Sequence, residues 1–68
     1  MENVGRGGSM IYWICFKRIN GIIQYIAGTD DSGGFYHTTN EREAAKFVDF
    51  NYAMLQFNRG YTVEKRED

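Results

Sequence analysis

The sequence of 68 residues has no proline, one cysteine and almost no excess of charge of either sign. Because a single cysteine cannot form an internal disulfide, the sequence excludes a secreted mini-protein held together by disulfides and favours a reducing compartment. Eight Lys and Arg against nine Asp and Glu give a net charge of −1. Binding to nucleic acid or to an anionic membrane by charge needs a basic excess, so we expect neither as a partner.

Long apolar runs are missing as well. The longest run, from Ile11 to Phe16, is far shorter than the ~20 residues that span a bilayer. Residues 1–9 contain three glycines and no apolar core, which excludes a secretory signal and predicts a disordered leader. This leader is a remnant of an expression linker, a translated ribosome-binding site before a natural start at Met10, or a native flexible arm. We therefore expect a single cytoplasmic domain over residues 10–64.

What the sequence has in excess is aromatic residues: five Phe, five Tyr and one Trp. A domain of about 60 residues buries only ~60% of the surface that its unfolded chain exposes. Each aromatic side chain can bury ~150–250 Å², so this set is more than one small core encloses. We expect some rings to lie on the surface, where an aromatic patch on a small protein usually marks a contact site.

Two apolar segments joined by Asn20-Gly21 predict a β-hairpin. The segments 11–19 and 22–27 are rich in aromatic and β-branched residues, and Asn-Gly favours a type I′ turn. A two-residue turn sets a register in which Phe16 faces Tyr25 and Cys15 faces Ile26. One face then carries Trp13, Cys15, Lys17, Ile19, Ile22, Gln24 and Ile26, and the other Tyr12, Ile14, Phe16, Arg18, Ile23, Tyr25 and Ala27. Since both faces are mostly apolar, we expect one to pack on the domain's own helix and the other on a partner or on further chain.

The rest of the chain predicts a loop, a short strand, a helical stretch and a last strand. Residues 28–34 have loop composition, and 35–38 form a short strand antiparallel to the second. Helical spacing runs from about residue 41 to 59 and slips in phase near 48–51, which gives one kinked helix or two short ones. Gly60 ends the helix in a left-handed conformation, residues 61–64 form the last strand, and 65–68 are a frayed charged tail. The order β-β-β-α(α)-β is an α+β fold, an antiparallel sheet with helix on one face.

Candidate catalytic and metal-ligating residues have structural explanations. Asp30, Asp31 and His37 match no known metal-ligand spacing, and an Asp pair is typical of a turn. Cys15 lies in the middle of an apolar strand, where cysteine is a small buried hydrophobe. The glycine-rich loop 28–34 leads into a strand, whereas a phosphate-binding loop leads into a helix. We expect no cofactor, no metal and no catalytic activity.

The layout resembles that of small proteins encoded by phages and prophages of low-GC Gram-positive bacteria. The likeness spans residues 11–64, and its parts are the hairpin from Tyr12 to Tyr25, Thr38-Thr39-Asn40, Glu43-Ala44-Ala45-Lys46-Phe47, Ala53, Gly60 and Tyr61-Thr62-Val63-Glu64. The group shares no catalytic motif, so no functional residue is carried over. The resemblance implies a protein that binds a host protein and blocks it.

Three functions compete. The first is a protein-binding protein without catalysis, a homodimer or an inhibitor of a host enzyme or defence factor. Its predicted binding residues are Tyr12, Trp13, Phe16, Arg18, Tyr25, Phe35 and Tyr36, because aromatic residues and Arg are common binding hot spots. The alternative is a single-stranded nucleic-acid-binding module that uses Lys17, Arg18, Trp13 and Tyr25. The third is a small enzyme that uses His37 or Cys15, although domains of this size rarely hold a polar-lined pocket of ~300 Å³ or more.

Overall fold

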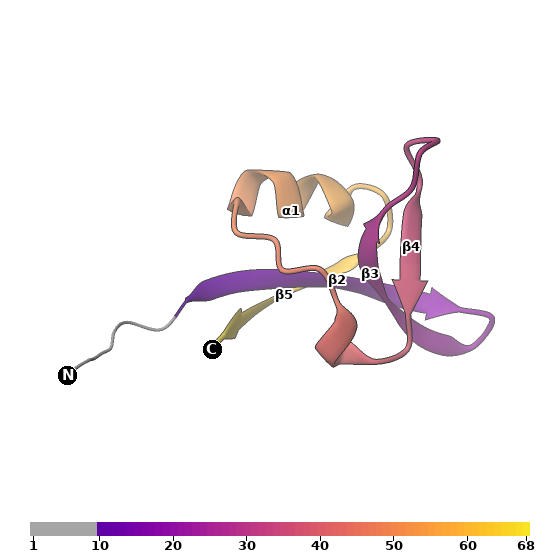
Figure 1. Cartoon of the computed structure of the whole chain (residues 1–68), viewed down its shortest axis with the longest axis horizontal. Coiled ribbons are helices and arrows are strands. Elements are labelled where there is room, and N and C mark those ends of the chain that lie inside the picture. The colour runs from indigo at the N-terminus through magenta and orange to yellow at the C-terminus, as the bar shows by residue number, and fades with distance from the viewer. Residues whose placement is uncertain (1–9) are drawn as a thin grey trace.

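The structure, a computed structural model, describes residues 10–68 (Figure 1). The predicted leader, residues 1–9, lies outside the described residues. The elements in chain order are β2 (Ile11–Ile19), β3 (Ile22–Thr29), β4 (Phe35–Thr38), the 3₁₀ turn η1 (Glu41–Glu43), α1 (Phe50–Phe57) and β5 (Thr62–Glu67). The strands form one antiparallel sheet in the order β4-β3-β2-β5, with α1 on one face. The predicted α+β class is confirmed.

The β2–β3 hairpin forms as the Asn-Gly dipeptide predicts. Asn20 and Gly21 have φ of 54° and 81°, the left-handed pair that a type I′ turn requires. The register pairs Phe16 with Tyr25, as predicted. The pairing predicted between Cys15 and Ile26 does not form, because the register of β2 with β3 ends at Phe16 and the two strands diverge from there.

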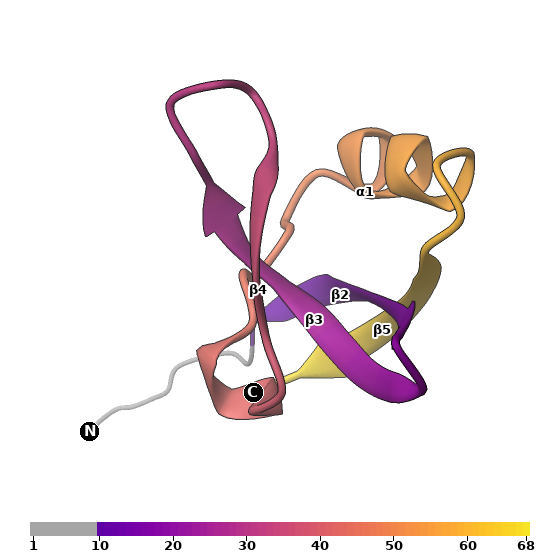
Figure 2. The same ribbon diagram turned by 90° about the vertical axis from the view of Figure 1, so that its right-hand side faces the viewer.

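Residues 44–49, which we call the connector, fill the space between the diverging strands (Figure 2). Phe47 exchanges both backbone hydrogen bonds with Trp13 of β2, with N···O distances of 2.8 and 2.9 Å. The Ala45 N–H donates to the Ile26 carbonyl of β3 at 2.8 Å. The prediction of helix from residue 41 is therefore wrong over the connector. The spacing of Ala44, Phe47 and Val48 indicated a helix. Backbone hydrogen bonds to β2 and β3, which are distant in sequence, form here in place of the hydrogen bonds within a helix.

The chain end is better ordered than predicted. Gly60 has a φ of 95° and ends the helical segment as expected, and β5 then pairs along β2 from Phe16–Thr62 to Ile11–Glu67. The prediction of a frayed tail over residues 65–68 is wrong, because β5 continues to Glu67 and the Asp68 N–H donates to the Met10 carbonyl at 3.0 Å. Cross-strand hydrogen bonds to β2 hold this charged segment in the sheet.

The core lies between α1 and the sheet. Its buried residues are Cys15, Ile26, Ala53 and Tyr61, with Trp13, Phe35, Ala45, Phe47 and Val63 packed around them. No helix among residues 10–68 is long and apolar enough to cross a bilayer.

The other face of the sheet is covered in part by the chain's own η1 turn, on the side opposite α1 (Figure 1). The Arg66 guanidinium on β5 binds Glu41 of η1 at 3.0 Å and Glu64 at 2.9 Å. The hydrogen bond from Arg66, and to a smaller extent one from the Tyr25 hydroxyl, lowers the pKa of Glu41. On this face Ile14 is only 1% exposed.

Candidate protein-binding surface

The structure divides the seven predicted binding residues between the two faces of the sheet. Strand alternation places Tyr12, Phe16, Arg18, Tyr25 and Tyr36 on the η1 face and Trp13 and Phe35 on the α1 face. The predicted residues therefore do not form one patch.

Most of these predicted residues contact side chains of their own chain. The rings of Phe16 and Tyr25 lie 5.4 Å apart, and the Lys46 ammonium lies 4.9 Å from the centre of the Tyr12 ring. On the α1 face, the Trp13 ring lies 5.2 Å from the Phe50 ring. Their aromatic surfaces are thus largely used inside the fold.

The predicted surplus of rings is nevertheless present on the surface. Among all the aromatic side chains only Tyr61 is buried, while Tyr36, Phe50, Tyr52 and Phe57 are 45–61% exposed. All but Tyr36 belong to α1. The exposed rings therefore gather on the helix, a location that the sequence analysis did not predict.

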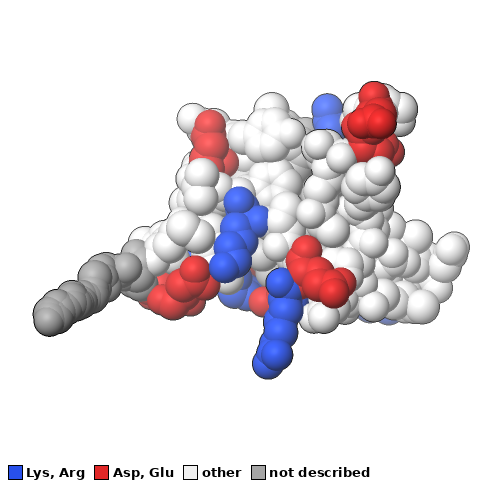
Figure 3. Space-filling model, in the orientation of Figure 1, with Lys and Arg blue, Asp and Glu red and all other residues white. Residues whose placement is uncertain are grey.

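Helix α1 buries small and polar side chains and leaves most of its large apolar ones exposed. Its two buried residues are Ala53 and Gln56, at 0% and 1% exposure. Its exposed apolar residues, which we call the α1 surface, are Phe50, Tyr52, Leu55 and Phe57. A surface helix normally turns its apolar side to the core and its polar side to water. In Figure 3 the surface over α1 is largely free of Lys, Arg, Asp and Glu.

Local sequence fixes where this helix begins and ends. The Asp49 carboxylate accepts hydrogen bonds from the N–H groups of Asn51 and Tyr52, at 2.9 and 3.3 Å, which is an N-cap. After α1, the Tyr61 N–H donates to the Gln56 carbonyl at 3.0 Å, across Gly60. These bonds fix where the helix begins and ends. Which of its residues face the sheet is set by packing against β2, where the Cys15 Sγ lies 3.9 Å from the Ala53 carbonyl oxygen.

A signal for this surface was present in the sequence. Residues 50–57 read FNYAMLQF, in which only Asn51 and Gln56 are strongly polar. A helix on one face of a sheet buries only one side, so a segment that is apolar all round must expose large apolar residues. The spacing of the apolar residues indicates a helix but not how many of them a single helix can bury.

The residues considered for catalysis are engaged in structural roles. Cys15 is fully buried as predicted, and burial raises the pKa of its thiol to about 11. At that pKa the nucleophilic thiolate is scarce at neutral pH. The His37 Nε2 lies 2.7 Å from the Tyr61 hydroxyl, and the two rings stack at 5.9 Å. Within residues 10–68, no group of three or more His, Cys, Asp or Glu side chains is placed to hold a metal ion.

The acidic loop between β3 and β4 is a self-contained turn. One oxygen of the Asp30 carboxylate accepts hydrogen bonds from the Ser32 N–H, the Ser32 hydroxyl and the Gly34 N–H, at 2.8–2.9 Å. The hydroxyl bond from Ser32 is the main cause that lowers the pKa of Asp30. This arrangement matches the turn predicted for the Asp pair.

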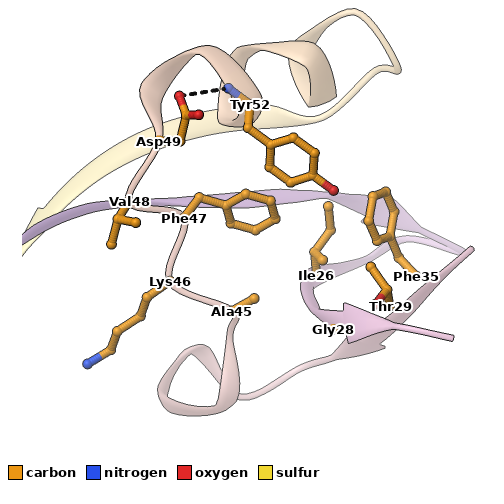
Figure 4. Close-up of a pocket in the computed structure, with 10 residues that line it drawn as sticks. All are labelled: Ile26, Gly28, Thr29, Phe35, Ala45, Lys46, Phe47, Val48, Asp49 and Tyr52. Carbon is orange, nitrogen blue, oxygen red and sulfur yellow. Dashed lines mark hydrogen bonds between the residues drawn. The ribbon is translucent and has the colours of Figure 1, made fainter. Parts of the chain in front are cut away.

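A pocket of about 420 Å³ lies beside α1 (Figure 4). Rings from three elements line it: Phe35 of β4, Phe47 of the connector and Tyr52 of α1. It is larger than expected of so small a domain, and its lining comes from β3, β4, the connector and α1. In Figure 2 the connector runs between the β3–β4 hairpin and α1. Its lining is mainly apolar, unlike the convergent polar groups of a catalytic site.

Comparison of the chain with protein-family models, with curated proteins and with solved structures gives no match.

Proposed function

We propose that this chain is a non-catalytic protein-binding module that engages its partner through the α1 surface. The observation that carries the proposal is that α1 buries Ala53 and Gln56 while Phe50, Leu55 and Phe57 are about half exposed. Fully burying one large apolar side chain contributes ~1.5–3 kcal/mol. A partner that covers the exposed half of the α1 surface therefore gains several kcal/mol before the cost of association.

The charge and exposure of the α1 surface suit a protein partner. Apolar and aromatic residues that are free of charge are typical of the centre of a protein–protein interface. The resemblance to small phage proteins supports an inhibitor of a host enzyme or defence factor as the specific form of the proposal. An inhibitor needs only to occupy a surface of its target, which requires no catalytic group.

The placement of residues 10–68 does not favour the nucleic-acid alternative. Its four predicted residues are divided between the faces, with Trp13 and Lys17 on one and Arg18 and Tyr25 on the other. The Lys17 ammonium lies 4.4 Å from the centre of the Tyr61 ring, and an Arg18 Nη donates to the Gly21 carbonyl at 3.1 Å. Stacking platforms for bases combine exposed rings and free cations on one surface, which these residues do not form.

The proposal is tested by capture from cells in which the chain naturally occurs, followed by quantitative mass spectrometry. The test variant is Phe50→Ser with Phe57→Ser, two exposed rings of the α1 surface. The matched control is Ile22→Ser, since Ile22 is 55% exposed at the hairpin turn, away from α1. We expect a partner that the wild type and the control enrich and that the double variant loses by at least ~10-fold. Equal capture by a folded double variant would refute the proposal.

A further inference from the structure

We propose that the pocket beside α1 receives the ring of a tryptophan or tyrosine side chain of the partner protein. This inference rests on the proposed function, because Tyr52 belongs both to the α1 surface and to the pocket wall. It specifies the chemistry of the partner residue that anchors the complex. Three features of the pocket support the inference: its aromatic walls, the engagement of its charged residues in other contacts, and the hydroxyl group of Tyr52.

The walls of the pocket are rings held in place by contacts within the fold. Phe47 and Tyr52 stack at 5.6 Å with an angle of 20° between their planes. Phe35 is held edge-on by Tyr61, with ring centres 6.2 Å apart and an angle of 88°. Because these walls are already packed, an aromatic occupant adds stacking and edge contacts without first ordering the side chains that it meets.

The charged residues at the pocket are engaged elsewhere. The Lys46 side chain points away from the rings (Figure 4), and its ammonium lies 3.3 Å from the Asp68 carboxylate. The Asp49 carboxylate accepts the hydrogen bonds that cap α1. The lining residues offer a charged occupant no ion pair in exchange for the hydration it loses, and the Arg59 guanidinium nearby lies over the Phe35 ring, 5.8 Å from its centre. The lining therefore favours an uncharged group.

The hydroxyl of Tyr52 distinguishes among uncharged rings. It points across the pocket toward Phe35 (Figure 4), and the Tyr52 residue is 45% exposed. An occupant that covers this hydroxyl removes it from water, which is costly unless the occupant supplies a partner. An indole N–H or a phenol O–H supplies one, whereas a phenylalanine or leucine side chain does not.

A side chain of a bound protein fits the pocket better than a free small molecule does. Sites for free ligands place several polar groups around the ligand to orient it. Here the lining offers one phenol and the Thr29 hydroxyl among mainly apolar groups. A partner docked on the α1 surface orients its own side chain, and Tyr52 makes that surface continuous with the pocket.

The test is an NMR titration of the full chain with N-acetyl-tryptophanamide, and with N-acetyl-phenylalaninamide and N-acetyl-leucinamide as neutral controls. We expect saturable shifts of the Ile26 and Ala45 methyl signals, because both side chains line the pocket. The tryptophan amide should bind at least ~5-fold more tightly than the phenylalanine amide. The absence of saturable shifts, or equal affinity for the two aromatic amides, would overturn the inference.

Two variants assign the binding to the pocket. Tyr52→Phe removes only the hydroxyl, so it should bring the affinities of the two aromatic amides to within about twofold. Ala45→Leu places extra volume in the pocket and should abolish the shifts. If Ala45→Leu does not fold, Tyr52→Ala serves instead, since Tyr52 is 45% exposed, and it should weaken binding by ~10-fold or more. A tryptophan preference that survives Tyr52→Phe contradicts the inference.

The same titration separates failure of the pocket from failure of the proposed function. Leu55→Ser and Phe57→Ser alter the α1 surface outside the pocket lining and should leave the titration unchanged. No amide binding, with partner capture still dependent on the α1 surface, would overturn the pocket inference alone. Amide binding, with partner capture indifferent to the α1 surface, would overturn the proposed function and remove the partner on which the pocket inference rests.

Discussion

Gln56 is the polar side chain at the contact between α1 and the sheet. It is 1% exposed, its Nε2 donates to the Tyr52 carbonyl at 3.2 Å, and its Oε1 has no hydrogen-bond partner among the described residues. A buried polar atom without a partner costs ~1–3 kcal/mol. The helix thus carries an energetic cost on its buried side while Phe50 and Phe57 remain about half exposed. A partner bound to the α1 surface would offset that cost.

We predict that Gln56→Met raises the free energy of unfolding by about 1 kcal/mol, because methionine has a similar length and no oxygen to leave unpaired. Urea unfolding at fixed protein concentration measures the change. Gln24→Met is the matched control and should have little effect, since Gln24 is only half-buried on the sheet. A loss of stability in Gln56→Met would contradict the prediction.

For single residues, the sequence predicted the features that depend on neighbouring residues along the chain. The positive φ of Gly60 follows from local turn chemistry, and the burial of Cys15 follows from the apolar strand around it. Which aromatic rings stay exposed depends on how α1 turns toward the sheet. That rotation is set by packing between residues about 40 positions apart, such as Cys15 and Ala53, whose Sγ and carbonyl oxygen lie 3.9 Å apart.

Among the secondary-structure elements and the segments that join them, the β2–β3 hairpin could be predicted from the sequence and the connector could not. The β2–β3 hairpin was predictable because a two-residue turn links neighbouring segments. The connector was not, because its hydrogen bonds go to Trp13 and Ile26, which are distant in sequence. Its residues have helical spacing, but the backbone bonds offered by two diverging strands outweigh that propensity. The α1 face of the sheet and the pocket both depend on this one segment.

The η1 turn is tied to β5 by the ion pair between Glu41 and Arg66, which yields a pH-dependent prediction. Because the folded state lowers the pKa of Glu41 below its ordinary 4.5, its contribution to stability is present above that pH and is lost as pH falls through the folded pKa. Glu41→Gln should therefore lower the urea midpoint at pH 7 and leave it nearly unchanged at about pH 2.

The control for Glu41→Gln is Asp31→Asn, which removes a negative charge from the exposed loop between β3 and β4. It should show no comparable difference between the two pH values. The effect of Glu41→Gln should also shrink in ~1 M salt, because both partners are substantially exposed. A pH-independent effect would mean that Glu41 acts through packing instead of charge.

At the scale of the whole molecule, the apolar residues are divided unevenly between core and surface. The buried hydrophobic residues of the described chain are Ile14, Cys15, Ile26, Ala44, Ala53 and Tyr61. A larger set is exposed, namely Met10, Ile11, Ile22, Ile23, Tyr36, Val48, Phe50, Tyr52, Leu55 and Phe57. A small domain with so little core is marginally stable alone and gains from association. The aromatic composition predicted this surplus, although it did not locate it.

The free chain should therefore self-associate through the α1 surface, and not through the aromatic face of the sheet that the sequence indicated for a homodimer. An eight-residue helix is only ~12 Å long, so the interface should be small and the dimer weak. Sedimentation velocity from about 10 µM to 1 mM measures the association. Phe50→Ser with Phe57→Ser should abolish the dimer and Ile22→Ser should not. A wild type that stays monomeric to 1 mM would contradict the prediction, and so would a dimer that persists in the folded double variant.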